Sequence, residues 1–245
     1  MTISLVVLFF AAAWAGVQNA LAGGGTFLTL PCLILTGMDA RAANITSTVG
    51  LFPAQVITGM TVAKNASGAA SLSLRALVVI SLIGGGAGAV LLLVTPSSFF
   101  AAMVPWLVLF ATVIFAFGSY MPKQMPRLGS FGAGVAQFLI AIYGGYFGGG
   151  IGFLMLAALA AAGLAMRGAG ATKNVLASVM NLSAVAIFVF SPQLHWLQAG
   201  IVILGSVGGG FAGGLMVNKI NEKALRLFVV LIGLALTVGL FLRAA

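Results

Sequence analysis

Acidic side chains are almost absent from this sequence. Only two, Asp39 and Glu222, occur in 245 residues, and charged residues together make up 5% of the chain. A soluble domain carries about 25% charged residues, whereas 62% of this chain is hydrophobic and its mean hydropathy is +1.21. The composition therefore excludes a water-soluble globule and predicts an integral membrane protein.

Histidine and cysteine are equally scarce, with one residue of each, His195 and Cys32. A single cysteine cannot form an internal disulfide, and two such side chains cannot complete a structural zinc site, which needs about four ligands. The sequence also lacks a Ser/His/Asp arrangement, an HExxH motif and a phosphate-binding P-loop. We therefore expect no enzymatic activity, no metal and no cofactor.

The net charge of +9 does not indicate a nucleic-acid partner. The eleven lysines and arginines are scattered singly through short loops and form no basic patch. Cations in this pattern are typical topology signals at the cytoplasmic ends of membrane helices. We expect membrane lipid around the protein and no nucleic acid, and the sequence leaves a homodimer open.

Apolar runs of helical length fill the chain and predict an all-α polytopic fold. A run of about 20 residues is long enough to cross a hydrocarbon core about 30 Å thick. The runs cover 3–22, 25–36, 44–63, 74–94, 99–119, 129–147, 151–163, 170–190, 196–217 and 223–243. The second and seventh runs would make helices of only about 18–20 Å, too short to span unaided.

The second half of the chain repeats the first. The glycine triplet Gly23–Gly25 recurs as Gly148–Gly150, and "RAANITSTVGLFPAQ" (41–55) lies over "RGAGATKNVLASVMN" (167–181). We divide the chain into a first transmembrane repeat (1–121), a cytoplasmic linker (122–128) and a second transmembrane repeat (129–245). Such repeats are typical of secondary transporters, whose sites lie at the repeat interface.

The distribution of cations predicts how the short runs are placed. If each short run is a mere continuation of the run before it, the cations divide six to five and favour no orientation. If each long-plus-short pair forms a hairpin, nine of eleven fall on one side, in agreement with the positive-inside rule. These nine are Lys64, Arg75, Lys123, Arg127, Arg167, Lys173, Lys219, Lys223 and Arg226, and Arg41 and Arg243 lie opposite.

The hairpin arrangement predicts two inverted repeats, each with four long helices and one short broken segment. Five segments per half is an odd number, so the halves face opposite ways and both termini lie outside the cytoplasm. The glycine triplets then break the chain at the hairpin tips, where glycine permits a sharp reversal. The alternative is that these glycines are small-residue contacts between straight helices, an explanation that suits the glycines at 84–86 and 208–210 better.

Polar residues follow each glycine break. They are Asn44, Thr46 and Ser47 at the start of the third run, Thr172, Lys173 and Asn174 at its repeat mate, and Gln55 and Asn181 about two turns further on. Such residues act as helix N-caps, but the same helix N-termini also offer free N–H groups to an anion. The two amides could join helices or line a path, and Lys173 could extend to the interface or neutralise a ligand.

The position of the two carboxylates favours an anionic ligand. Asp39 and Glu222 both fall at predicted segment ends, so no carboxylate is expected inside the membrane. An intramembrane proton relay or a carboxylate sodium site would need one, and a cationic substrate would lack a counter-charge.

The chain resembles the TauE/SafE family of sulfite and organosulfonate exporters. The resemblance rests on "AGGGTFLTLPCLILTGMDARAANITSTVGLFPAQ" (22–55) and its degenerate copy "FGGGIGFLMLAALAAAGLAMRGAGATKNVLASVMN" (147–181). The family pattern is a glycine-rich break, a proline-bearing apolar piece, and a helix opening with Thr-Ser or Lys-Asn. Pro31 supplies the proline in the first copy, and the second copy lacks it.

The resemblance implies export of a small sulfur-containing anion, sulfite or a C2 organosulfonate, across a bacterial inner membrane. The oxyanion would lie between the two hairpins and accept hydrogen bonds from backbone N–H groups of the triplets and from Thr46, Ser47, Thr172 and Asn174. Lys173 would offset its charge, while Gln55 and Asn181 would line the route. The rival interpretations are an anion channel and a non-transporting membrane scaffold or assembly factor.

Overall fold

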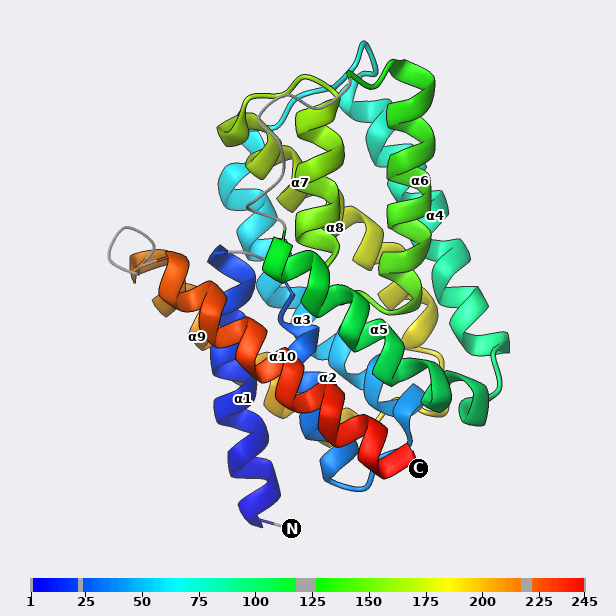
Figure 1. Ribbon diagram of the computed structural model, residues 1–245, viewed down its shortest axis with the longest axis vertical. Coiled ribbons are helices and arrows are strands. Elements are labelled where there is room, and N and C mark those ends of the chain that lie inside the picture. The colour runs from blue at the N-terminus through cyan, green and yellow to red at the C-terminus, as the bar shows by residue number, and fades with distance from the viewer. Residues whose placement is uncertain (1, 22–23, 118–126, 217–221, 245) are drawn as a thin grey trace.

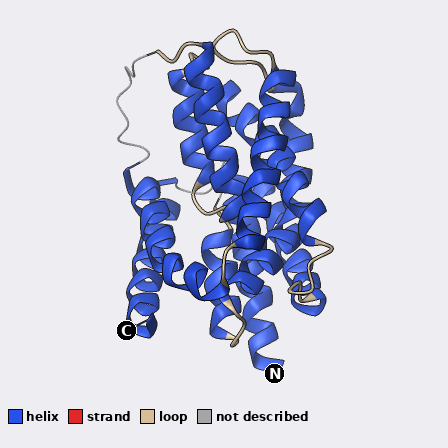
Figure 2. Ribbon diagram, turned by 90° about the vertical axis from the view of Figure 1, so that its right-hand side faces the viewer, coloured by secondary structure: helices blue, strands red, loops and turns tan. Residues whose placement is uncertain are grey.

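The computed structural model describes residues 2–21, 24–117, 127–216 and 222–244 (Figure 1). These residues form ten α-helices and one 3₁₀ turn, joined by the loops that Figure 2 shows in tan. The helices are α1 (Thr2–Leu21), α2 (Thr26–Leu35), α3 (Ala40–Val62) with η1 (Ala63–Asn65), α4 (Leu74–Val94), α5 (Ser97–Phe117), α6 (Ser130–Tyr146), α7 (Ile151–Ala161), α8 (Met166–Phe188), α9 (Trp196–Met216) and α10 (Glu222–Ala244). The all-α prediction is confirmed, and each expected run corresponds to one helix.

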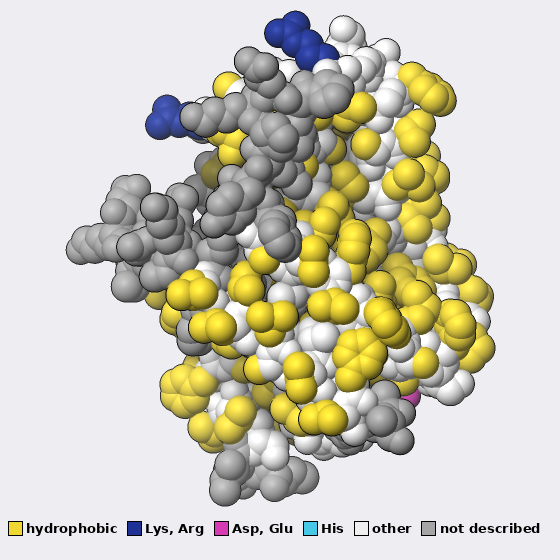
Figure 3. Space-filling view, in the orientation of Figure 1, with side chains coloured by type: hydrophobic (Ala, Val, Ile, Leu, Met, Phe, Trp, Pro, Cys, Tyr) yellow, Lys and Arg dark blue, Asp and Glu magenta, His cyan; other side chains and the backbone are white. Residues whose placement is uncertain are grey.

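Length and composition alone mark four helical segments as able to cross a membrane. They are Ala40–Asn65, Leu74–Val94, Ser97–Ile114 and Met166–Phe188, and each contains a strongly apolar stretch. Large apolar side chains are exposed on other helices as well, for example Leu204 on α9 (69%). Figure 3 shows such side chains spread over much of the visible face, with Lys and Arg at its upper end. An apolar surface of this extent is suited to lipid rather than to water.

Each short helix folds back beside the long helix that precedes it. In Figure 1, α1 and α2 occupy the lower half of the molecule and α6 and α7 the upper half, so that both junctions lie near the middle. Gly24 (φ +91°), Gly148 (+81°) and Gly150 (+75°) adopt left-handed conformations at these junctions. Glycine takes up this conformation without the steric cost that a Cβ atom brings. The glycines therefore permit the two reversals.

The helices pack in two bundles, and each bundle takes one helix from the other half of the sequence. Helix α9 packs on α1 and α3, and α2 lies against the same two helices; likewise α4 packs on α6 and α8, and α7 lies against these two. Helix α3 crosses α8 between the bundles, and α5 pairs with α10. Exchanging each helix of the first half with its counterpart in the second leaves these packing pairs unchanged. The inverted orientation of the halves in a membrane stays a prediction.

Three glycines of α4, Gly84, Gly85 and Gly88, serve close helix packing. A Cβ atom on Gly85 would collide with the backbone carbonyl of Met180 on α8, and one on Gly145 of α6 would collide with the carbonyl of Gly85. A Cβ on Gly209 of α9 would likewise collide with the carbonyl of Ala13 on α1. Small residues let helix backbones approach this closely. Among the glycines at 84–86 and 208–210, the small-residue explanation holds for Gly84, Gly85 and Gly209, whereas a Cβ on any of the other three would meet no atom closer than 3.8 Å.

Four exposed cations of the described residues gather at one end of the molecule. The loops that follow α3 and α7 and the segment before α6 hydrogen-bond to one another there, through Ala70 N to Ala162 O (3.1 Å) and Leu128 N to Ala161 O (2.9 Å). The exposed cations on or next to these segments are Lys64, Arg75 at the start of α4, Arg127, and Arg167 at the start of α8. Lys123 and Lys219 lie outside the described residues, as do the side chains of Glu222, Lys223, Arg226 and Arg243.

Arg41 joins three segments at the opposite end. Its guanidinium donates to the carbonyls of Leu93 (3.0 Å) and Thr95 (2.6 Å) and to Oε1 of Gln193 (2.8 Å). It therefore fixes the start of α3 to the α4–α5 turn and to the α8–α9 loop. The start of α1 and the end of α10 also lie at this end of the molecule in both ribbon views.

Candidate functional site

A small pocket lies where the two hairpin tips meet the crossing of α3 and α8. It encloses about 30 Å³, which exceeds the ~10–15 Å³ that one water molecule needs. The tips adjoin each other there, since Thr26 Oγ1 lies 3.6 Å from the position that a Cβ on Gly148 would take. The pocket is lined by Asn19, Gly24, Thr26, Gln55, Thr58, Gly148, Ile151, Gly152, Lys173, Asn174 and Ala177.

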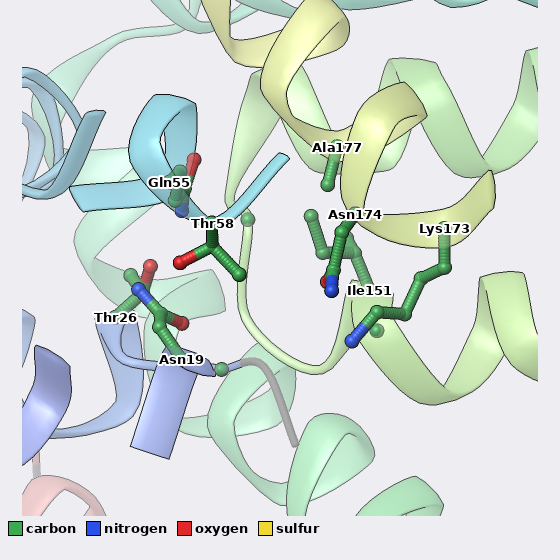
Figure 4. Close-up of a pocket in the computed structure, with 11 residues that line it drawn as sticks. Asn19, Thr26, Gln55, Thr58, Ile151, Lys173, Asn174 and Ala177 are labelled. Carbon is green, nitrogen blue, oxygen red and sulfur yellow. The ribbon is translucent and has the colours of Figure 1, made fainter. Parts of the chain in front are cut away.

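The two halves of the chain contribute different chemistry to this pocket. The first half supplies uncharged polar side chains from α1, α2 and α3, while the second supplies a cation and an amide from α8 (Figure 4). Five of the residues predicted from the sequence line it together: Gly24, Gln55, Gly148, Lys173 and Asn174. The pocket thus joins the two triplet regions with the polar cluster of the second repeat.

Lys173 is the charged group of the pocket. We expected it among the cations that face the cytoplasm, but the structure buries it, with 4% of its surface exposed. No hydrogen bond or salt bridge joins its ammonium group to another residue in the part of the chain that the structure describes, and no lining residue is acidic. A buried charge is costly unless an opposite charge or hydrogen bonds compensate it. The pocket is therefore suited to an anion.

Two helix N-termini adjoin the same pocket. Thr26 and Ile151 are the first residues of α2 and α7, and both line it. The first N–H groups of a helix have no acceptor within it, and the helix dipole places partial positive charge at this end. These groups add to the positive potential that Lys173 creates.

The polar clusters of α3 and α8 lie inside their helices, so the prediction that they open these helices is wrong. Helix α3 begins at Ala40, because the side chain of Asp39 accepts hydrogen bonds from the N–H groups of Arg41 (3.0 Å) and Ala42 (3.2 Å) and caps it. Helix α8 begins at Met166, also four residues earlier than expected. The N-termini near the pocket are those of the short helices instead.

Asn44 and Ser47 hold the first hairpin and the second tip against α3. Asn44 Nδ2 donates to the carbonyl of Tyr146 (2.9 Å), the last residue of α6, two positions before the second glycine triplet. Ser47 Oγ lies 2.6 Å from Thr29 Oγ1 on α2. Both side chains are buried, but neither lines the pocket. They connect the elements that form it.

Thr46 and Thr172 occupy equivalent positions in the repeats and make equivalent contacts. Thr46 Oγ1 accepts the N–H of His195 in the α8–α9 loop (3.2 Å). Thr172 Oγ1 accepts the N–H of Ser67 in the α3–α4 loop (3.0 Å) and donates to its carbonyl (3.1 Å). Thr46 on α3 therefore holds the loop that follows α8, and Thr172 on α8 holds the loop that follows α3.

Asn181 does not line the pocket but contacts a residue that does. Its Nδ2 donates to Gln55 Oε1 (2.6 Å), and Ser178 Oγ lies 2.8 Å from the carbonyl oxygens of both Gln55 and Asn174. These contacts join α3 to α8 where the helices cross. Gln55 thus lines the pocket, whereas Asn181 orients the side chain of Gln55 and joins the two helices.

The remaining glycines of the triplets lie at the tips without lining the pocket. Gly25 and Gly150 precede the first residues of α2 and α7, and Gly149 lies between two left-handed glycines. Gly23 lies outside the described residues.

Asn19, Thr26 and Thr58 line the pocket although we did not predict them. Thr58 Oγ1 donates to the carbonyl of Ala54 (2.9 Å) within α3. The sequence contains a feature that could have indicated Asn19: with Gln18, it is an amide in an otherwise apolar run that ends directly before a glycine triplet.

Comparison with known proteins matches this architecture to a membrane-protein family. The sequence pattern of the family described as "Sulfite exporter TauE/SafE" matches residues 8–240, nearly the whole chain. The chain belongs to the TauE/SafE family. Its TauE/SafE relatives include a probable membrane transporter protein of Haemophilus influenzae, 28% identical over 241 residues, which cover 95% of this chain and 92% of the relative.

Two further relatives carry similar descriptions. The probable membrane transporter protein YfcA of Escherichia coli (strain K12) is 26% identical, with 96% of this chain and 89% of the relative covered. The probable membrane transporter protein ORF9 of a Sinorhizobium species is 27% identical, with 96% and 92% covered. As a TauE/SafE member, the protein is an integral, multi-pass membrane transporter.

Proposed function

We propose that this protein exports a small sulfur-containing anion, sulfite or a C2 organosulfonate, from the cytoplasm. The observation that carries the proposal is the buried ammonium group of Lys173 in a pocket without acidic side chains, between the two hairpin tips. The family description supports sulfur anions as the substrate class. The anion occupies this pocket and neutralises the positive charge of Lys173.

Uncharged donors complete the binding site. The N–H groups of the first residues of α2 and α7, Thr26 and Ile151, and the amide of Asn174 hydrogen-bond the oxygens of the anion. Gln55, oriented by Asn181 (2.6 Å), forms the wall on α3. Asn44, Thr46, Ser47 and Thr172 act indirectly, because each holds an element or loop around the pocket.

The placement of charges supports export. The exposed cations at 64, 75, 127 and 167 share one end, and the positive-inside rule assigns that end to the cytoplasm of a bacterial inner membrane. The opposite end, where α1 starts and α10 ends, then faces outward. A membrane potential that is negative inside favours anion export by about 2.3 kcal/mol per charge per 100 mV.

The arrangement of the bundles supports alternating access. The pocket lies between two bundles that meet at the α3–α8 crossing, and secondary transporters expose such a site by rocking one repeat against the other. The paired contacts of Thr46 and Thr172 lie on opposite sides of this crossing, so opening toward either end would release one of them.

Sulfite efflux from proteoliposomes tests the proposal. With an imposed potential, we expect saturable sulfite flux that a small sulfonate inhibits, while liposomes without protein show none. A flux that does not saturate would indicate a channel. The absence of flux of sulfite, a sulfonate, sulfate and chloride, from protein shown to be folded, would contradict anion transport.

A further inference from the structure

Asn19 is an unusual residue at the tip of the first hairpin. It lies on α1, is 8% exposed, and accepts the N–H of Gly25 with its Oδ1 atom at 2.7 Å. Its Nδ2 atom is buried and has no hydrogen-bond partner among the described residues. The amide nevertheless lines the polar pocket (Figure 4).

A buried donor without an acceptor is rare in folded proteins and disfavours the state that leaves it so. The bond to Gly25 fixes which end of the amide faces the hairpin backbone, so the N–H₂ group is left as the free end. The wall of the pocket formed by α8 carries Lys173. A ligand that accepts a hydrogen bond from Asn19 and neutralises Lys173 would satisfy both groups together.

We propose that Asn19 is a substrate-contacting residue that determines specificity, and that the site selects a compact oxyanion with a single negative charge. This inference rests on the proposed anion transport and narrows its substrate class to singly charged forms, hydrogensulfite or a sulfonate monoanion. Asn19 donates from Nδ2 to one oxygen of the anion, and Lys173 neutralises its charge. Lys173 is the one cation among the described lining residues, so a second negative charge would enter the pocket uncompensated.

Methanesulfonate and sulfate are a suitable pair of probes, because both are tetrahedral and of similar size but differ in charge. Binding of each is measured on the purified, full-length protein by calorimetry. We expect methanesulfonate to bind at least tenfold more tightly than sulfate. Equal or tighter binding of sulfate would overturn the selection for a single charge, and so would sulfite flux without methanesulfonate binding.

The substitution Asn19→Asp tests the role of the free donor. Aspartate keeps an oxygen that accepts the Gly25 N–H but replaces the N–H₂ group with a charged oxygen. We expect the variant to fold and to lose at least tenfold in methanesulfonate affinity. Asn65→Asp is the matched control, since it adds the same charge at an exposed position on η1, and it should bind like the unmodified protein.

Unchanged affinity in folded Asn19→Asp protein would overturn the assignment of Asn19 while leaving the transport proposal intact. If Asn19→Asp does not fold, Asn19→Ala removes the donor without adding charge and is expected to lose affinity several-fold; unchanged affinity there would equally overturn the assignment. Absence of both binding and sulfite flux in the unmodified protein would instead reject anion transport itself.

Discussion

At the scale of single residues, the two repeats differ in charge at one pair of equivalent positions near the α3–α8 crossing. Ser47 and Lys173 are equivalent in the aligned repeats, yet Ser47 pairs with Thr29 on α2 and Lys173 lines the pocket. A second lysine at position 47 would be buried against the first hairpin without a partner. The divergence thus gives the protein one positive charge at a site built from two similar halves.

Replacing Lys173 with methionine is expected to reduce sulfite flux at least tenfold. Hydrogen bonds to charged groups contribute about 1.5–3 kcal/mol, and about 1.4 kcal/mol corresponds to a factor of ten in affinity. The measurement is flux in proteoliposomes at a sulfite concentration below saturation. Lys64→Met removes the same charge from an exposed position and should leave flux unchanged; equal effects of the two substitutions would exclude Lys173 from the site.

At the scale of secondary-structure elements, the glycine-rich reversals determine where the short helices begin. Gly150 precedes α7 with φ +75°, and a Cβ there would lie 3.0 Å from Cβ of Ala111 on α5. The reversal lets α7 start at the pocket, which Ile151 and Gly152 line. Backbone conformation and site geometry are therefore linked at this tip.

We expect Gly150→Ala to destabilise the protein by roughly 1–2 kcal/mol, the cost of a left-handed conformation for an L-residue, and to reduce flux. Thermal unfolding in detergent measures the first effect. Gly200→Ala is the control, because Gly200 lies within α9 with nothing within 4 Å of the added Cβ, so stability should stay the same or rise. A Gly150→Ala variant as stable as the unmodified protein would show that the tip tolerates another conformation.

At the scale of the whole molecule, the exchange of α4 and α9 between bundles makes the halves interdependent. Helix α4 packs on α6 and α8, and α9 packs on α1 and α3. The pocket likewise needs α1, α2 and α3 from one half and α7 and α8 from the other. We therefore expect neither half to bind the anion alone.

Cysteine labelling tests the orientation of this assembly. In a Cys32→Ala background, Ser98→Cys at the start of α5 should react with a membrane-impermeant maleimide in intact cells. Ser130→Cys at the start of α6, near Arg127, should react only after permeabilisation. Both serines are exposed, so accessibility of the side chain does not distinguish them. The reverse labelling pattern would place the cation-rich end outside and contradict the proposed direction.

The sequence by itself determined the elements of this protein, because local chemistry specifies them. Apolar runs of sufficient length form helices wherever they occur, and consecutive glycines interrupt them, so the ten helices and both reversals could be predicted. Helix starts were less certain, since Asp39 could be read as a loop residue or as the N-cap that it is.

Only the tertiary structure decided which polar residues share a site. Asn19 and Lys173 are 154 positions apart in the sequence, and they line one pocket because two hairpin tips meet at the crossing of α3 and α8. Thr46 and Ser47 resemble ligand-binding residues in the sequence, yet their partners are a distant loop and α2. Hydrogen-bond partners depend on how helices pack, and packing depends on contacts between residues that the linear pattern does not pair.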